Sequence, residues 1–485
     1  MSGALSIPPS LAERQHAAFD PTHSAWVSAN AGSGKTHVLT LRVLRLLLDG
    51  APPAQILGLT FTKAAAANMA DRLFKTLAEW ARLDDDKLAE RIRDLRAGDV
   101  GGHDLRTARR LFARAIETPG GLKIQTLHAF CERLLQLFPF EANVPAHFRV
   151  VDEREARVLI GRARDRALTA LRASASAAPA LDLAAREGGA ARFDDLLTEA
   201  QNFADVFEAF DDPASFSEAL RIRLRLPPGV TTAGVEEEML GGDIERMRRK
   251  AWATVLDRGS KSDRKLAICL REVEDGERSD RVDALMRVFF TEDGTGGRRG
   301  TDERPIVTKG LADCASMLLS ELQAEQDRLV SLRERRRAAQ TLERSAALFA
   351  VAKTILIAYE QAKAERGQLD FSDQIARALA LVRRSSAAWV MRKLDCALDH
   401  LLVDEAQDTS AAQWGVLEAL TAEFFAGEGA RGRNRTVFAV GDEKQSIFSF
   451  QGAAPEKFAE MRRRFAKRCA EAALPFENVP LNFSF

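Results

Sequence analysis

The sequence predicts an α/β protein in which a parallel sheet is covered by helices and interrupted by a large, mostly α-helical insertion. Three observations indicate this fold class. Short apolar runs alternate with helical patterns up to about residue 145, as in strand–helix units of a parallel sheet. The next stretch, to about residue 365, has helical spacing and is rich in Ala, Leu, Arg and Glu. Strand signals then return, so we expect both ends of the chain to build one sheet.

The individual elements follow from hydrophobic spacing and from the residues that end each run. Buried strands are expected at 25–29, 55–61, 122–126, 400–403 and 436–440. Helices are expected at 35–49, 63–80 and 127–138, with Gly50 as the C-cap of the first. No second set of strands is predicted after about residue 453.

Composition limits the class of protein. The 485 residues carry 70 basic and 70 acidic side chains, so the net charge is zero and gives no global signal for nucleic acid. The five cysteines are far apart without a CxxC pair, which argues against a disulfide scaffold or a zinc site. The N-terminus does not resemble a signal peptide, and no apolar run approaches the ~20 residues that span a bilayer. We therefore expect a cytoplasmic protein.

The strongest motif is ANAGSGKT at 29–36, which follows a predicted strand and opens a predicted helix. This is the context of a phosphate-binding loop, in which Gly32 and Gly34 let backbone amides face phosphate oxygens at a helix N-terminus. Lys35 would reach the terminal phosphates of ATP, and the Thr36 hydroxyl would bind Mg²⁺. The cradle comprises Ala29, Asn30, Ala31, Gly32, Ser33, Gly34, Lys35 and Thr36. A chance glycine-rich turn is disfavoured because the flanking strand and helix are both present.

A second motif, HLLVDEAQD at 400–408, is an apolar strand that ends in two adjacent carboxylates. An isolated Asp-Glu pair is usually a solvated turn. Beside a phosphate-binding loop, however, Asp404 can hold the Mg²⁺ shell, and Glu405 can orient and deprotonate the attacking water. The pair therefore favours ATP hydrolysis.

A third motif, VGDEKQSIFSFQGA at 440–453, follows the next predicted strand. Gln445 is suited to sensing a γ-phosphate because its amide adds no charge. Phe448 and Phe450 can pack in a core or stack on nucleic-acid bases, and spacing leaves both alternatives open.

Together with LTFTKAAAANMADRL and IQTLHAFC, these motifs occur in the order seen in UvrD/RecB-type superfamily 1 DNA helicases, which the chain resembles. FSFQGA, LDFSDQI and the long insertion are most similar to the AddA branch, the helicase–nuclease subunits of double-strand-break repair. The resemblance implies a P-loop RecA-like fold. Its domains would be the first part of the ATP-binding domain at 1–148, a helical insertion at 149–365 and the second part of the ATP-binding domain at 366–485.

The resemblance also implies roles for further residues. Gln15 would read the adenine edge, and Phe485 would stack on adenine. Single-stranded DNA would contact Thr60, Phe61, Thr62, Thr126, His128, Phe130 and Phe450. Gln451 stands where many relatives have an arginine, which puts one polar link between ATP and DNA in doubt.

The function implied is the ATP-binding motor of an ATP-dependent 3′–5′ DNA helicase in recombinational repair. It would use ATP and Mg²⁺, act on single-stranded DNA and DNA ends, and form a heterodimer with an AddB-like partner. The alternatives are a housekeeping UvrD-type helicase and a non-translocating, DNA-stimulated ATPase scaffold. A P-loop kinase is disfavoured because no phosphate-acceptor site is evident.

Two parts of such an enzyme have no counterpart in the sequence. A second RecA-like domain would supply arginines that are worth ~10³–10⁵ in rate, and the branch also carries a nuclease domain. We therefore expect an N-terminal fragment that hydrolyses ATP slowly and does not unwind duplex DNA alone. The final residues LNFSF resemble a motif cut one residue before its arginine.

Overall fold

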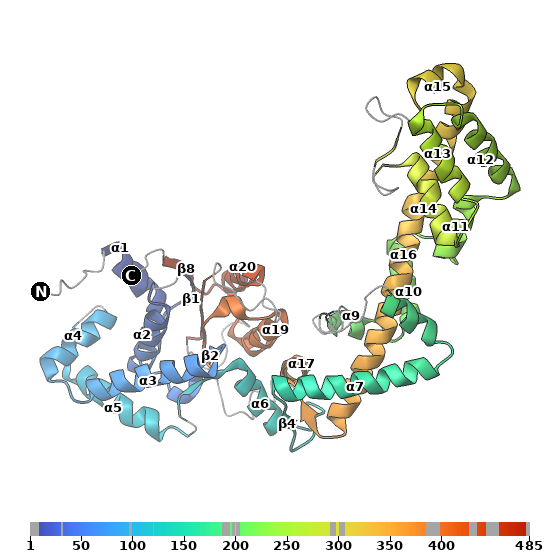
Figure 1. Ribbon diagram of the computed structural model, residues 1–485. Helices are drawn as coiled ribbons and strands as arrows, with labels where there is room; N and C mark the ends of the chain where they lie inside the picture. Colours follow the sequence, from blue (N-terminus) through green and yellow to red (C-terminus); the bar gives the residue numbers. More distant parts are fainter. Residues whose placement is uncertain are drawn as a thin grey trace, which may run out of the picture. The chain divides into compact units, whose positions relative to one another are not determined.

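The computed structural model describes residues 9–30, 33–96, 99–119, 121–186, 195, 199, 204–291, 297–299, 306–384, 398–425, 434–442 and 455–481 (Figure 1). The chain divides into two compact units. The first joins Met1–Leu159 to Gln361–Phe485, and the second is Ile160–Glu360. The division falls within two long helices, α7 (Glu153–Ala173) and α16 (Ser316–Ala364).

The first unit is built on a sheet of six parallel strands in the order β3-β2-β6-β7-β1-β8. These strands are β1 (Ser24–Ala29), β2 (Ile56–Thr60), β3 (Lys123–Thr126), β6 (His400–Val403), β7 (Thr436–Gly441) and β8 (Phe476–Leu481). Segments from both ends of the chain alternate across it, since β6 and β7 lie between β2 and β1. The prediction of a parallel sheet covered by helices is therefore confirmed.

The central strands are apolar on both faces because helices cover both. Every residue of β2, β6 and β7 is buried, as expected for strands inside a parallel sheet. The register pairs Leu59 with Val403 and Val27 with Val440. Because the carboxyl ends of parallel strands lie at one edge, the loops after these strands meet there.

Strand β8 was not predicted. Its sequence, FENVPL, contains Pro480 and only partly buried residues, so its apolar signal is weak. Proline cannot donate to a ladder and is tolerated on an edge strand, which is where β8 lies, beside β1. This strand extends the first sheet rather than starting a second one.

Two layers of helices pack on opposite faces of the sheet, as Figure 1 shows. One face carries α2 (Lys35–Leu48), α3 (Lys63–Trp80) and α5 (Gly102–Glu117), and the other carries α6 (Leu127–Leu137), α17 (Phe371–Arg383), α19 (Ala411–Leu420) and α20 (Pro455–Glu471). Side chains along β1 alternate between these layers, as strand geometry requires. Trp26 stacks on Trp414 with ring centroids 5.5 Å apart, whereas Val27 belongs to the core under α2.

Short elements complete the first unit. They are α1 (Pro9–Phe19), η1 (Pro53–Gln55), α4 (Asp85–Leu95), the paired strands β4 (Arg149–Val150) and β5 (Gln368–Leu369), η2 (Ala406–Asp408) and η3 (Ala422–Phe425). At the end of α16, the buried Lys363 donates to Asp370 and to Asp373, the N-cap and N3 residues of α17. A buried cation with two carboxylate partners thus fixes the start of α17.

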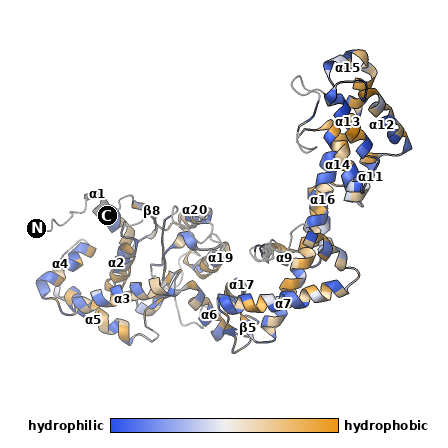
Figure 2. Ribbon diagram, in the orientation of Figure 1, coloured by the Kyte–Doolittle hydropathy of each residue, from blue (hydrophilic) through white to orange (hydrophobic). Residues whose placement is uncertain are grey.

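The second unit is helical. Besides parts of α7 and α16, it contains α9 (Ala204–Ala209), α10 (Pro213–Arg223), α11 (Thr232–Leu240), α12 (Asp243–Leu256), α13 (Lys261–Glu272), α14 (Arg278–Phe289) and α15 (Lys309–Cys314). One core forms around Trp252, Leu285 and Leu322, and another around Phe207 and Phe349. Figure 2 shows hydrophilic and hydrophobic residues interleaved along these helices, as expected when one face of each is packed.

Two sequence expectations concern the chain as a whole. Cys131, Cys269, Cys314 and Cys469 carry free thiols, and two of them are buried. Among the helices in the described residues, none has an apolar stretch long enough to cross a bilayer.

Candidate functional site

The phosphate-binding loop leads from β1 into α2. Gly34 is the N-cap of α2 and adopts φ 86° and ψ 27°, a left-handed conformation that a side chain would strain. No side chain caps the helix at this residue, so the first amides of α2 remain available to an external acceptor. Ser33 is buried and donates to the carbonyl oxygen of Asn30 over 2.7 Å. Local backbone geometry thus suits an anion at this helix end.

The start of the loop is fixed to the edge of the sheet. The amide of Asn30 donates to the carbonyl oxygen of Leu481 over 3.4 Å, and Ala29 is buried opposite Leu481 in the β1–β8 ladder. The unpredicted strand β8 therefore helps to position the loop.

The two carboxylates of DEAQD lie where β6 ends. The backbone amide of Asp404 donates to the carbonyl oxygen of Leu59 over 2.8 Å, which continues the β2–β6 ladder. Burial, followed by the adjacent charge of Glu405, raises the pKa of Asp404 to about 6. Glu405 adopts φ 49° and ψ 44°, a left-handed conformation that is uncommon for a residue with a side chain.

Lys35 and Glu405 form an ion pair across the site. The Lys35 Nζ lies 3.3 Å from Glu405 Oε2, and the Lys35 side chain is only 12% exposed. Lys35 also favours the charged form of Asp404 electrostatically. The loop after β1 and the loop after β6 are therefore adjacent, so the residues predicted to act on ATP and Mg²⁺ come together.

Gln407 is a site residue to which the sequence assigned no role. Its side chain is buried and bridges Glu405 to the backbone of Asp442 at the end of β7. The only available signal was its place within DEAQD, since an amide in a polar motif resembles an ordinary turn residue.

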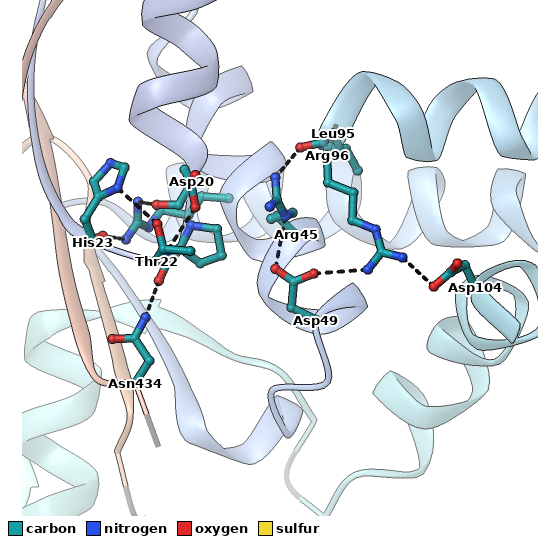
Figure 3. A network of polar contacts seen from close by, with 11 residues as sticks. Asp20, Thr22, His23, Arg45, Asp49, Leu95, Arg96, Asp104 and Asn434 are labelled. Carbon is teal, nitrogen blue, oxygen red and sulfur yellow. Dashed lines mark hydrogen bonds and ion pairs between the residues drawn. The ribbon is translucent and has the colours of Figure 1, made fainter. Parts of the chain in front are cut away.

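Arg42 anchors α2 from within the protein. It is fully buried, and its guanidinium donates to the carbonyl oxygens of Ala18, Asp20 and His23. Burial lowers its pKa to about 9, so the group still carries its charge at neutral pH. Figure 3 shows the segment it holds, where Asn434 donates to the carbonyl oxygen of Pro21 over 2.8 Å. The end of α1 is thereby fixed to α2.

A second set of contacts holds the C-terminal end of α2. Arg45 pairs with Asp49, which also contacts Arg96, and Arg96 reaches Asp104 at the start of α5 (Figure 3). These half-exposed pairs contribute little individually but form a network across α2, α4 and α5. They position the helix that begins at Lys35.

Gln15, which the resemblance assigns to the adenine edge, lies beside the phosphate-binding loop. The side chain is buried on α1, and its Nε2 is 3.8 Å from the position that a Cβ on Gly34 would occupy. Because Arg42 ties the end of α1 to α2, the position of Gln15 relative to the loop depends on that buried arginine.

The residues assigned to DNA lie at the ends of β2 and β3. Thr62 caps α3 and Thr126 caps α6, each accepting a backbone hydrogen bond over 3.1 Å. Thr60, Phe61 and His128 line a small cavity of about 20 Å³ together with Asp404, Thr409 and Gln413. Such a space holds about one water molecule. These DNA candidates therefore share a cavity wall with the metal candidate.

Two of the DNA candidates are partly engaged in packing. The ring of His128 lies edge-on to Phe371 with centroids 5.2 Å apart, and burial lowers the pKa of this histidine. Phe130 packs against the core under α17 and α19. The remaining candidates, Ala31, Gly32, Gln445, Phe450 and Phe485, lie outside the described residues, as do Phe448 and Gln451.

The described residues suit a magnesium–nucleotide complex. An uncapped helix N-terminus and a lysine match phosphate groups. The pKa of Asp404 is raised because its charge is buried, and a nearby divalent cation would favour that charge. Thr36 follows Lys35 in the first turn of α2 and would join Asp404 in holding the metal.

Known proteins with similar sequences match most of the chain. The chain is 24% identical to the ATP-dependent helicase/nuclease AddA of Lactobacillus gasseri over 94% of its length, and 27% identical to that of Levilactobacillus brevis over 98%. The corresponding protein of Moorella thermoacetica is 26% identical over 90% of the chain. The chain spans only 37%, 37% and 31% of these relatives.

A family profile gives the most direct assignment. The profile of the UvrD/REP helicase N-terminal domain matches residues 11–466, which include the phosphate-binding loop, the DEAQD motif and the insertion. The chain therefore belongs to the UvrD/REP helicase N-terminal domain family.

Proposed function

We propose that this chain is the ATP-binding motor domain of an ATP-dependent DNA helicase that moves 3′–5′ and acts in double-strand-break repair. The observation that carries the proposal is the contact between Lys35 and Glu405, 3.3 Å apart, beside the buried Asp404. A lysine from a phosphate-binding loop and two carboxylates from a neighbouring strand end form the minimal set for ATP hydrolysis. The relatives' name, ATP-dependent helicase/nuclease, supports this function.

Each described residue has a distinct task in this proposal. Bound MgATP would supply the phosphoryl group and the divalent cation. Lys35 and the first amides of α2 bind the phosphates, and Thr36 and Asp404 hold the metal. Glu405 orients a water molecule and accepts its proton. Because Lys35 pairs with Glu405 in this structure, arriving phosphates compete for the lysine and release the carboxylate for this task.

The proposal extends to the rest of the assignment. Residues 1–148 and 366–485 form the ATP-binding domain, and 149–365 form the helical insertion. Single-stranded DNA passes over the ends of β2 and β3, at Thr60, Phe61, Thr62, Thr126 and His128. The protein works in the cytoplasm on DNA ends with an AddB-like partner.

The decisive experiment compares ATP hydrolysis with and without single-stranded DNA in three variants. Lys35→Met should lose nucleotide binding and hydrolysis. Glu405→Gln should keep nucleotide binding but lose hydrolysis by ~10²–10⁴-fold, the usual worth of general base catalysis. Lys467→Met is the matched control because this lysine is 76% exposed on α20. Hydrolysis that survives both site substitutions would overturn the proposal.

Strand displacement tests the helicase assignment itself. Duplexes with a 3′ or a 5′ single-stranded overhang report the direction of movement, and a 3′ requirement is expected. Hydrolysis stimulated by DNA without strand displacement on either duplex would instead favour a non-translocating ATPase. Equal use of both overhangs would contradict the 3′–5′ direction.

A further inference from the structure

Gln407 is buried between the end of β6 and the end of β7, with only 2% of its surface exposed. Its Nε2 donates to Glu405 Oε2 over 2.9 Å and to Asp408 Oδ2 over 3.1 Å. Its Oε1 accepts from the backbone amide of Asp442 over 2.9 Å. Both amide hydrogens and the oxygen are therefore used.

The chemistry of the partners fixes the orientation of this amide. A backbone N–H only donates, and an ionised carboxylate only accepts. The oxygen of Gln407 must therefore face Asp442, and its nitrogen must face Glu405 and Asp408. A flipped amide would place two donors together on one side and oxygen against carboxylates on the other.

The end of β7 leaves no freedom around this side chain. A Cβ on Gly441 would lie 2.6 Å from Gln407 Oε1, 3.1 Å from the Gln407 backbone nitrogen and 2.9 Å from the ring of Phe458. Only glycine permits this approach. The Gln407 amide is thus held against the strand rather than mobile beside it.

Glu405 needs such support because of its own backbone. A left-handed conformation at a residue with a side chain persists when neighbouring groups determine it. Glu405 Oε2 receives both Lys35 Nζ at 3.3 Å and Gln407 Nε2 at 2.9 Å. Of these two donors, the lysine is the one expected to move toward phosphates, and the buried amide remains.

We propose that Gln407 is a positioning residue that holds the Glu405 carboxylate for proton transfer and ties it to the end of β7. This inference rests on the proposed ATP hydrolysis. Gln407 touches neither nucleotide nor water in this assignment. Its loss should therefore change the rate of the chemical step and leave nucleotide affinity unchanged.

Two substitutions separate its two contacts. Gln407→Met has nearly the same volume but loses the hydrogen bonds on both sides. Gln407→Glu keeps an oxygen that accepts from Asp442 but turns a carboxylate oxygen toward Glu405 and Asp408. Gln374→Met is the matched control, because Gln374 is 1% exposed in the same unit and its amide has no hydrogen-bond partner among the described residues.

The experiment measures kcat and KM for ATP, with kcat expressed per nucleotide-binding site as titrated with a fluorescent ADP analogue. Gln407→Met should lower kcat by ~10-fold and Gln407→Glu by ~100-fold, since general base catalysis depends on placement of the carboxylate. KM and the ADP-analogue Kd should stay within about twofold, and Gln374→Met should match the wild type.

Each outcome has a defined consequence. If Gln407→Met binds nucleotide and keeps the wild-type kcat, the inference is overturned even though the proposed function stands. If both Gln407 variants change KM and kcat together, Gln407 supports the binding site as a whole, and the positioning role is wrong. A wild-type protein that binds ATP without hydrolysing it would overturn the proposed function and this inference with it. Should Gln407→Glu fail to fold, Gln407→Met decides.

Discussion

Arg42 donates a hydrogen bond to the carbonyl oxygen of Ala18 over 2.9 Å, with both groups enclosed by the protein. The same guanidinium reaches the carbonyl oxygens of Asp20 and His23 and lies 5.1 Å from the ring centroid of Phe438. One buried cation therefore connects α1, the segment before β1, and β7 to the helix that carries the phosphate-binding lysine.

Replacing Arg42 should destabilise the first unit. Arg42→Met leaves buried carbonyls without donors, so the free energy of unfolding should fall by about 3 kcal/mol. Urea unfolding followed by tryptophan fluorescence measures this, since Trp26 and Trp414 stack in the same unit. Arg114→Met, at an exposed position on α5, is the control. Equal unfolding midpoints for both variants would contradict the anchoring role of Arg42.

Gly441 should not tolerate a methyl group. In Gly441→Ala the new Cβ would lie within 3 Å of Gln407 and Phe458, so we expect a loss of about 1–3 kcal/mol in stability from overpacking. Gly161→Ala is the matched control, because this glycine lies in α7 with no atom within 4 Å of a new Cβ. That control should gain about 0.5–1 kcal/mol from helix propensity. Thermal unfolding of the two variants should therefore shift in opposite directions.

The sheet of the first unit could be read from the sequence because its central strands are buried on both faces. Runs such as HLLV have no polar interruption, so they show their structure locally, and their observed bounds match the expectation. Strand β8 could not be found in this way. Half of its residues are exposed, and its pairing with β1 comes from a distant part of the chain.

The site was predictable where chemistry needs a particular residue type in a local pattern. Lys35, Asp404 and Glu405 were found because a phosphate loop and a strand-end carboxylate pair are short motifs. Arg42 and Gln407 were missed because their roles arise from partners far away in sequence. Arg42 contacts carbonyls 19 to 24 residues earlier, and Gln407 contacts an amide 35 residues later.

Phe61 and Phe130 should respond differently to truncation, although the resemblance assigns both to DNA. Phe61 is half-buried at the end of β2 and lines the cavity beside Asp404, whereas Phe130 packs against the core. Phe61→Ala should weaken single-stranded DNA binding by ~1–3 kcal/mol if it stacks on a base, with little change in unfolding. Phe130→Ala should instead lower stability by about 3 kcal/mol.

Fluorescence anisotropy of a labelled oligonucleotide and thermal unfolding of the same samples distinguish these effects. Measurements at fixed salt are needed, because DNA affinity depends strongly on ionic strength. If Phe130→Ala loses DNA affinity while its unfolding temperature is unchanged, the assignment of Phe130 to the core rather than to DNA is wrong.

His400 should make the protein sensitive to acid. It is buried at the start of β6, its Nδ1 lies 2.9 Å from Thr436 Oγ1, and burial, followed by the charge of Arg42, lowers its pKa to about 4. The unfolded chain binds this proton near pH 6.5, where the folded chain does not. The free energy of unfolding therefore falls as the pH drops from about 6.5 towards 4, by up to about 3 kcal/mol in total.

His400→Asn should remove this slope, because the amide can replace the contact to Thr436 but does not titrate. Urea unfolding at several pH values between 4 and 7.5 should show the variant losing less stability than the wild type on acidification. Asp404, whose raised pKa acts in the opposite direction over a similar range, is present in both proteins and cancels in the difference. His147→Asn, at an exposed position, should keep the wild-type slope. Parallel curves for His400→Asn and the wild type would mean that His400 accepts a proton inside the folded protein as readily as in the unfolded chain.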